Sequence, residues 1–175
     1  MPSTRNIWKH TDPSSASRKS LVALARKALQ EGDSLLAYDI ANKTLDIQGP
    51  RDIELRHITA SALINAGCPM RAVKDLETMV KEGQAEEETL GLFASACKDI
   101  WEISSDPDQQ ETYGRQALEL YKRGFQQSGG TYTGINAAAM HLFLGEKSEA
   151  MSVGKDVLSI LQAQPADDYW HLATL

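Results

Sequence analysis

The stretch ASALINAGCPMRA, residues 60–72, contains the spacing that decides the fold. Gly67 is followed five residues later by Ala72, and Ala60 stands twelve residues before Ala72. The same spacing occurs twice more, for Ala25, Gly32 and Ala37 and for Ala138, Gly145 and Ala150. A glycine accepts the positive φ that ends a helix, and small side chains on two helices allow their backbones to approach closely. The pattern therefore predicts antiparallel helix pairs, each joined by a tight turn.

The distance between successive pairs gives the repeat length. Ala60 lies 35 residues after Ala25, and Ala94 lies 34 residues after Ala60. This matches the period of about 34 residues that is typical of tetratricopeptide repeats (TPR). We therefore assign Ala94 to the first helix of a third pair, with Ala117 on the partner helix. These two alanines are 23 residues apart instead of twelve, which predicts either an extended helix end or an insertion in the turn near residues 104–110.

The predicted fold is all-α: a TPR-like α-solenoid of about four and a half helix pairs over residues 13–175, after a flexible tail over residues 1–12. Prolines mark four of the helix starts, where a missing N–H is tolerated, namely Pro13, Pro50, Pro69 and Pro107. No segment alternates as a strand does. We expect helices over residues 13–31, 34–48, 51–66, 69–82, 87–103, 109–127, 132–144, 147–163 and 167–175.

The last of these helices has no partner helix in the sequence. Ala173 lies 23 residues after Ala150, so residues 167–175 are expected to be the first helix of a fifth pair. We interpret the chain as a fragment of a longer protein; the alternative is that a partner covers the open end. An uncovered edge favours self-association, so we expect a homodimer through residues 167–175.

Composition and charge narrow the function classes. The chain has 175 residues, of which 42% are hydrophobic and 24% charged, and a net charge of -6. Its basic residues are scattered and form no stripe that could neutralise phosphates, so nucleic acid is not an expected partner. Cys68 and Cys97 fit a reducing compartment, which favours the cytoplasm. The sequence shows no signal peptide and no apolar run long enough to span a bilayer.

The motifs of common enzyme families are missing. The sequence contains no HExxH or CxxC metal motif, no phosphate-binding loop and no GxSxG nucleophile elbow. We therefore predict a non-catalytic chain without a metal or cofactor site. His141 is interpreted as a packed or half-exposed helix residue and Trp101 as a packing residue. The acidic run Glu86–Glu88 is favourable at a helix start because of the helix dipole.

The first helices of stacked pairs line the concave face of a solenoid, which is the usual binding surface. Counting from the small alanine of each first helix predicts the groove positions. The candidate partner-binding residues are Lys19, Arg26, Gln30, His57, Ser61, Asn65, Lys98, Asp99, Tyr132, Ile135, Leu142 and Phe143. The basic ones, Lys19, Arg26 and Lys98, are divided between the first and third repeats, so a clamp for a peptide's terminal carboxylate is not supported. The apolar ones are concentrated in the fourth repeat, where they either anchor a partner segment or are covered by the fifth repeat and its neighbour.

Three segments resemble a known family: ETLGLFASACKDIWEI (88–103), LYKRGFQQSGGTYTGINAAAMHLFLGE (120–146) and DDYWHLATL (167–175). They are similar to the TPR-like "TRAFs-binding" domain in the central regulatory region of apoptosis signal-regulating kinases and in bacterial multidomain proteins. The most specific pieces are the run from Tyr132 to Asn136 and the pair Tyr169-Trp170. The resemblance implies a helical regulatory or scaffold segment of a signalling protein, linked to effector domains.

Two functions from different classes follow from these observations. The first is a protein-interaction and regulatory scaffold module, whose partner is a protein, a peptide or an attached effector domain. The second is an input domain that senses a small ligand and controls an attached enzyme. A pocket with convergent polar groups and shifted pKa values would favour the second function.

Overall fold

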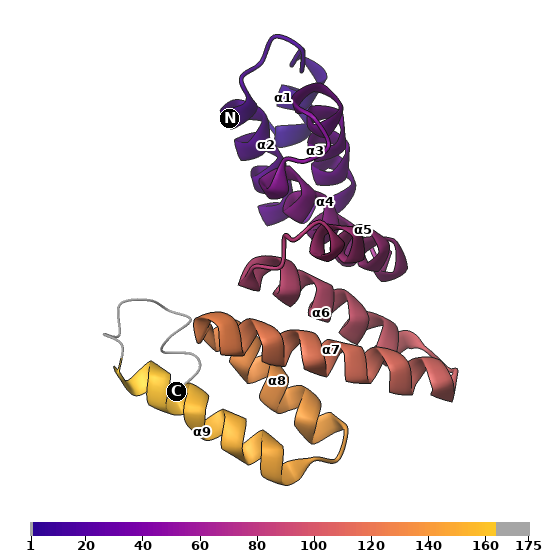
Figure 1. Ribbon diagram of the computed structural model, residues 1–175. Coiled ribbons are helices and arrows are strands. Elements are labelled where there is room, and N and C mark those ends of the chain that lie inside the picture. The colour runs from indigo at the N-terminus through magenta and orange to yellow at the C-terminus, as the bar shows by residue number, and fades with distance from the viewer. Residues whose placement is uncertain (1, 164–175) are drawn as a thin grey trace. The chain divides into compact units, whose positions relative to one another are not determined.

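The computed structural model describes residues 2–163, and all regular secondary structure in that range is helical (Figure 1). The chain divides into two compact units, Met1–Gln84 (unit 1) and Ala85–Leu175 (unit 2). The prediction of an all-α, TPR-like fold is confirmed. The predicted helix over residues 167–175 lies outside the described residues, and so does the dimer contact that we assign to it.

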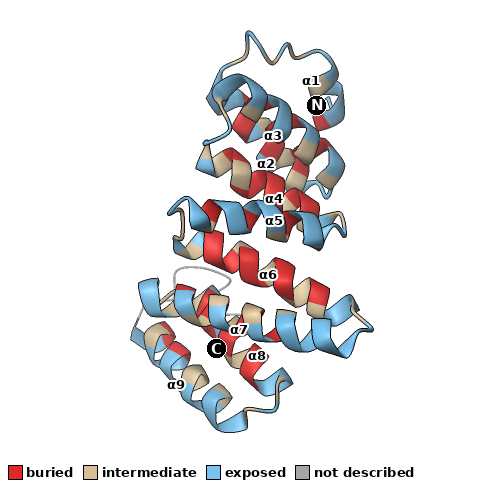
Figure 2. Cartoon of the chain, turned by 45° about the vertical axis from the view of Figure 1, so that its right-hand side comes forward, coloured by how far each residue is buried: buried red, intermediate tan, exposed pale blue. Residues whose placement is uncertain are grey.

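Unit 1 is built around the alanines that the sequence spacing singled out. Its helices are α1 (Thr4–Lys9), α2 (Arg18–Gln30), α3 (Ser34–Gln48), α4 (Ile53–Asn65) and α5 (Pro69–Lys81). Ala25 and Ala37 are buried where α2 packs on α3, and Ala60 and Ala72 are buried where α4 packs on α5. Buried positions, red in Figure 2, occupy most of α4, because α2, α3 and α5 all pack against it.

The predicted turn glycines end helices with the expected backbone geometry. Gly32, Gly67 and Gly145 have φ values of 76°, 73° and 82°. This left-handed conformation strains any residue with a Cβ. The turns of three helix pairs are therefore determined by glycine, as the sequence predicts.

The third pair is longer than its neighbours because both of its helices are extended. Unit 2 contains α6 (Glu87–Ile103), α7 (Pro107–Ser128), α8 (Thr131–Phe143) and α9 (Lys147–Ala163). Only residues 104–106 separate α6 from α7. Ala94 and Ala117 are both buried, so the pairing is right and the additional residues lengthen the helices. An insertion in the turn, the other predicted solution, does not occur.

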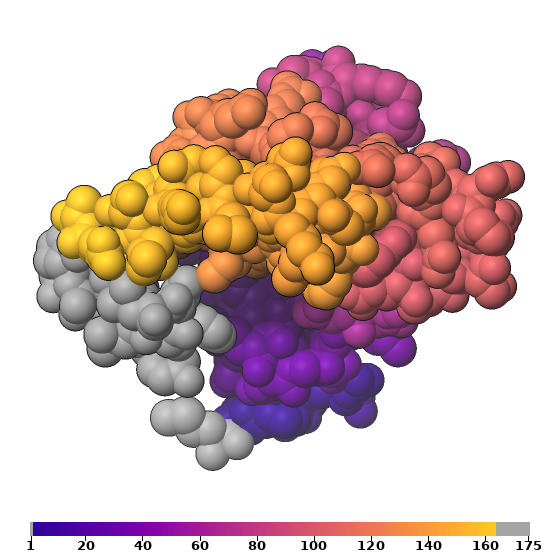
Figure 3. All heavy atoms as spheres, turned by 90° about the horizontal axis from the view of Figure 1, so that it is seen from below, coloured from indigo at the N-terminus to yellow at the C-terminus, as the bar shows by residue number. Residues whose placement is uncertain are grey.

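The fourth pair makes its close contact one turn earlier than predicted. Ala138 and Ala150 are only half-buried. A Cβ on Gly134 would lie 2.6 Å from Val157 Cγ2 and 2.7 Å from Phe125 Cδ2, so a glycine allows α8 to approach α7 and α9. Most residues of α9 remain on the surface of unit 2 (Figure 3).

The N-terminal segment differs from the predicted flexible tail, because Thr4–Lys9 form helix α1. Ser3 caps this helix by accepting a hydrogen bond from the Asn6 N–H at 3.3 Å, Trp8 packs against the core of unit 1, and Arg5 pairs with Asp33 at 2.6 Å. Helix α2 begins at residue 18 rather than 13, since Ser17 provides its N-cap. The α1 helix is too short for its periodicity to stand out in the sequence.

Candidate functional site

The strongest candidate site lies on the two first helices of unit 2. We define the α6–α8 face by six of the predicted groove residues: Lys98 and Asp99 on α6, and Tyr132, Ile135, Leu142 and Phe143 on α8. α6 and α8 run in the same direction, and an aromatic contact joins them near each end. The ring of Tyr132 lies over Gly91, with Cε1 3.3 Å from where a Cβ would stand, and Phe143 stacks on Trp101 at a centroid distance of 5.5 Å. Between these two contacts the face extends for about 15 Å, given the rise of a helix.

A small cavity marks the Tyr132 end of this face. It measures about 230 Å³ and is lined by Glu87, Glu88, Gly91, Leu92 and Tyr132. The cavity exists because Gly91 has no side chain where α6 passes under the tyrosine ring. Two carboxylates on its rim give this end an acidic character.

Glu87 also connects α6 to the beginning of α8. Its carboxylate accepts hydrogen bonds from Ser128 Oγ at 2.6 Å and from Thr133 Oγ1 at 2.9 Å. A Cβ on Gly130 would collide with this carboxylate, so a larger residue there would displace Glu87 from its two hydrogen bonds. The acidic run therefore has a structural role beyond its interaction with the helix dipole, and the Gly129-Gly130 connection is a structural joint.

Two polar groups belong to this region: Asp99, two residues before Trp101 on α6, and Tyr121, which packs against Tyr132. Asp99 is half-buried and forms no hydrogen bond or ion pair with other described residues, and burial raises its pKa. Tyr121 on α7 is fully buried, and within residues 2–163 its hydroxyl makes no hydrogen bond of good geometry, although Ser95 and Tyr132 lie close enough to influence its pKa. The Tyr121 ring packs edge-on against Tyr132 at 6.2 Å. Burial raises the Tyr121 pKa, and the charge of Asp99 contributes to that shift.

The Phe143 end of the face is apolar and open to solvent. Phe143 is 58% exposed, Leu142 54% and Ile135 42%. Trp101, beneath Phe143, packs over Gly114 of α7, where a Cβ would approach its Cδ1 to 2.9 Å. Trp101 is thus a packing residue, as interpreted from the sequence.

His141 lies next to this face but is buried within a polar link. Its Nδ1 is 2.6 Å from a carboxylate oxygen of Glu146, which also pairs with Arg115 of α7. Arg115 in turn donates to Glu111 at 2.8 Å. The chain of contacts ties the end of α8 to α7, so His141 has the packed structural position that we expected.

The groove residues of unit 1 form no comparable site. The six are Lys19, Arg26, Gln30, His57, Ser61 and Asn65. His57 is buried, so its assignment to an exposed groove is wrong; α4 is surrounded on three sides by other helices. None of the six lines the cavity beside Tyr132 or the larger cavity that unit 1 itself contains.

An ion-pair network occupies the surface between α2 and α4 instead. Arg26 pairs with Glu54 at 2.9 Å, and Arg18 pairs with both Glu54 at 2.9 Å and Asp52 at 2.5 Å. Hydrogen bonds from Arg18 lower the pKa of Asp52 and of Glu54. Arg26 is therefore already neutralised by its own chain, which weakens it as a partner-binding residue.

Metal-ligating clusters and membrane-spanning helices are both missing from the described part of the chain. Across residues 2–163, histidine, cysteine and acidic side chains do not gather in groups of three that could hold a metal ion. None of the described helices has both the length and the apolar character needed to cross a membrane.

Comparison with known families places this geometry in context. The family model TPR-S, Tetratricopeptide Repeats-Sensor, matches residues 19–141. The chain belongs to the TPR-S family. The match runs from the first turn of α2 to the last turn of α8, so it includes four of the six residues of the α6–α8 face and ends before Leu142 and Phe143. No curated protein matches the chain.

Solved TPR structures share the fold of this TPR-S chain at low sequence identity. One is TTC0263, a thermophilic TPR protein in Thermus thermophilus: the TM-score is 0.73 at 17% identity, over 82% of this chain and 74% of that one. Another is MamA, from residue 41 to its end, from Desulfovibrio magneticus: the TM-score is 0.69 at 14% identity, over 93% and 84% of the two chains. At such identities the likeness shows the fold alone.

The groove positions predicted from the sequence include Tyr132 and Phe143 at the two ends of the α6–α8 face, but they do not include Tyr121. The spacing from each alanine predicts positions on first helices only, whereas Tyr121 comes from the second helix α7 and reaches the face from below. The sequence does contain one indication of Tyr121: a tyrosine on the buried side of a predicted helix places its hydroxyl in the core, where the hydroxyl needs a hydrogen-bond partner.

Proposed function

We propose that this TPR-S chain is a non-catalytic regulatory scaffold module of a signalling-type multidomain protein, and that the α6–α8 face binds a segment of its protein partner. The observation that carries the proposal is the combination of exposed apolar side chains at the Phe143 end with an unpaired, half-buried carboxylate, Asp99, close to the same end. Exposed contiguous apolar residues beside polar groups are typical of interaction sites.

The chemistry of the face indicates what a partner segment should contain. An apolar side chain would cover Leu142 and Phe143, which already presents a rigid aromatic surface through its contact with Trp101. A basic side chain within one turn of this anchor would meet Asp99, and the acidic rim formed by Glu87 and Glu88 lies further along α6. Pairing with a cation would remove the cost of holding the Asp99 charge in a half-buried place.

A peptide-selection experiment tests this proposal. Peptides displayed on phage and selected on the immobilised chain should combine an apolar anchor with Lys or Arg. Fluorescence anisotropy of a selected peptide should then show at least tenfold weaker binding to Leu142→Lys and to Asp99→Asn. Leu35→Lys on α3 is a matched control, since Leu35 is 70% exposed in unit 1 and far in sequence from the face. Wild-type affinity of both face variants would contradict the proposal.

The second candidate is a sensor of a small ligand that controls an attached enzyme domain. The buried Tyr121 hydroxyl favours it: Tyr121 does not line the cavity but packs against Tyr132, which does, and a ligand that displaced the Tyr132 ring could supply the hydrogen bond that this hydroxyl lacks. If so, the low-molecular-mass fraction of a cell extract should raise the melting temperature of the chain. The Tyr121→Phe substitution should abolish this rise. A rise that persists in Tyr121→Phe would exclude this site.

The resemblance to the TRAFs-binding domain supports the signalling part of the proposal, since that family links such modules to effector domains. Self-association through residues 167–175 is also part of the proposal. Sedimentation equilibrium of the whole chain should show a dimer, and a chain ending at residue 163 should be monomeric. A truncated chain that still dimerises would place the contact elsewhere.

A further inference from the structure

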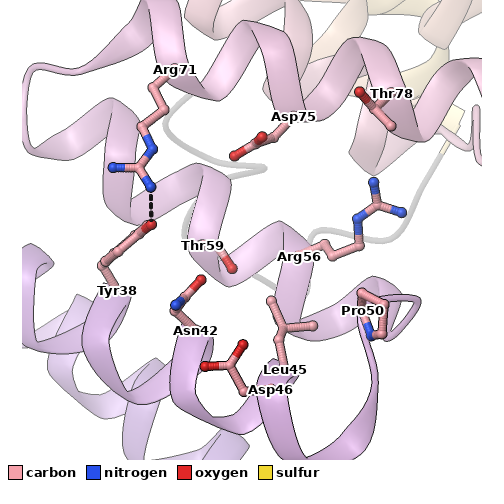
Figure 4. A pocket seen from close by; sticks show the side chains of 10 residues that line it. All are labelled: Tyr38, Asn42, Leu45, Asp46, Pro50, Arg56, Thr59, Arg71, Asp75 and Thr78. Carbon is pink, nitrogen blue, oxygen red and sulfur yellow. Dashed lines mark hydrogen bonds between the residues drawn. The ribbon is translucent and has the colours of Figure 1, made fainter.

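Unit 1 contains a second cavity that lies apart from every predicted groove residue. It measures about 490 Å³ and opens between α3, α4 and α5 (Figure 4). Ten residues line it: Tyr38, Asn42, Leu45, Asp46, Pro50, Arg56, Thr59, Arg71, Asp75 and Thr78. We propose that this α3–α5 pocket binds a basic side chain, arginine or lysine, presented by a peptide segment of a partner protein.

The pocket has two polar walls with matching helical spacing. Along α3, Tyr38, Asn42 and Asp46 follow one another at intervals of four residues and so share one side of the helix. Across from them, Arg71, Asp75 and Thr78 of α5 point into the same space (Figure 4). Thr59 and Arg56 of α4 lie between the walls. The walls are about 12 Å long by the helical rise, which accommodates one long side chain with its flanking backbone.

Both guanidinium groups of the pocket are already engaged. Arg71 donates a hydrogen bond to Tyr38 Oη at 2.5 Å, which closes one end of the pocket (Figure 4). Arg56 pairs with Glu82 and donates to Gln84 Oε1 at 3.2 Å. Tyr38 does not neutralise the charge of Arg71, which keeps further N–H donors, so the pocket contains this cation as well as its two carboxylates.

The unengaged groups of the pocket are mainly acceptors. Within residues 2–163, Asp46 and Asp75 form no ion pair or hydrogen bond, and neither does the amide of Asn42. The hydroxyl protons of Thr59 and Thr78 are donated to backbone carbonyls of their own helices, at 2.6 Å and 2.9 Å. What remains are two carboxylates on opposite walls, the Asn42 amide, hydroxyl lone pairs and the N–H donors of Arg71 that do not bind Tyr38. Such a set complements a group that carries positive charge and several N–H donors, as arginine and lysine do.

Titration of short peptides, followed by NMR of the uniformly labelled chain, tests the proposal. Ac-Gly-Arg-Gly-NH2 should shift the backbone amides of residues 42–46 and 71–78, and Ac-Gly-Lys-Gly-NH2 should do the same. The citrulline peptide, which has the shape of the arginine peptide without its charge, should bind at least tenfold more weakly. The proposal is overturned if the arginine peptide leaves these amides unchanged, or if inorganic phosphate shifts them and the peptide does not.

A pair of double variants separates the pocket from general electrostatic attraction. Asp46→Asn/Asp75→Asn should weaken binding of the arginine peptide at least tenfold. Asp39→Asn/Glu77→Gln removes the same charge from the same two helices outside the pocket, and should bind as the wild type does. Circular dichroism of both variants checks that the fold is retained. Equal weakening by the two double variants would overturn the proposal. This outcome is independent of the α6–α8 face, because that site lies in unit 2.

Discussion

The carboxylate of Asp99 is half-buried, and this burial makes its negative charge unfavourable. Burial raises its pKa above 3.8, and the nearby charge of Glu102 acts in the same direction. Lys98 opposes the shift without forming an ion pair with it. Residues with shifted pKa values and no structural partner are enriched at functional sites. The charge of Asp99 therefore lowers the stability of the folded chain, and a bound cation would remove this effect.

At the residue scale we predict that Asp99→Asn stabilises the free chain at neutral pH by roughly 0.5 kcal/mol, a small gain because solvent screens the half-exposed charge. The folded pKa is raised, so the charge penalty is present above that pKa and disappears as the pH falls through it. Urea unfolding at pH 7 should show the gain, and unfolding at a pH below 3.8 should show none. An equal gain at both pH values would mean that charge is not its cause.

Among the elements of unit 1, helix α4 has a start that combines two stabilising interactions in one side chain. Asp52 caps the helix by accepting a hydrogen bond from the Leu55 N–H at 3.2 Å, and it accepts a second from Arg18 of α2. The helix start and the α2–α4 contact therefore depend on the same carboxylate. Asn can keep the cap but not the charge, which separates the two interactions.

At the element scale we predict that Asp52→Ala lowers the free energy of unfolding by about 1–2 kcal/mol, whereas Asp52→Asn lowers it by about 0.5 kcal/mol. The pKa of Asp52 is lowered from 3.8 in the folded chain, so its negative charge stabilises the fold fully above pH 3.8. This stabilisation is lost as the pH falls through the lower pKa that Asp52 has in the folded chain. Chemical unfolding of both variants at neutral and acidic pH measures this. An Asn variant as unstable as the Ala variant would show that the ion pair outweighs the cap.

For the α6–α7 pair, the spacing of the alanines predicts the crossing point of the two helices but not the length of either helix. The alanine positions predict where the two helices cross, and Ala94 and Ala117 are indeed buried. Whether the additional residues extend the helices or loop out does not follow from spacing, because both solutions keep the same crossing point. Trp101 packing over Gly114 favours the extended helices, since this contact requires both helices to continue past the crossing.

The whole molecule has two units of opposite charge balance. Ala85–Leu175 carries 14 acidic and 6 basic side chains, whereas Met1–Gln84 carries 10 acidic and 12 basic ones. Each unit contains its own packed helices. The acidic surplus of unit 2 is in keeping with a basic group in its partner.

At the scale of the whole molecule we predict that residues 85–175 fold when expressed alone, with a helical circular dichroism spectrum and a cooperative thermal transition. Salt should raise the melting temperature of this fragment more than that of residues 1–84, because it screens the repulsion among the excess acidic groups. A fragment without a cooperative transition, or an equal salt effect on both fragments, would contradict the prediction.

The amino-acid sequence by itself determined the helix pairs, their glycine turns and the repeat length. These features depend on local spacing and on backbone conformations that only glycine adopts freely. Only the tertiary structure decided which polar groups meet: Asp46 faces Asp75 from a helix two elements away, and Tyr121 lies beneath Tyr132. Such encounters depend on how each helix is rotated against its neighbours, and that rotation results from the packing of all their side chains together.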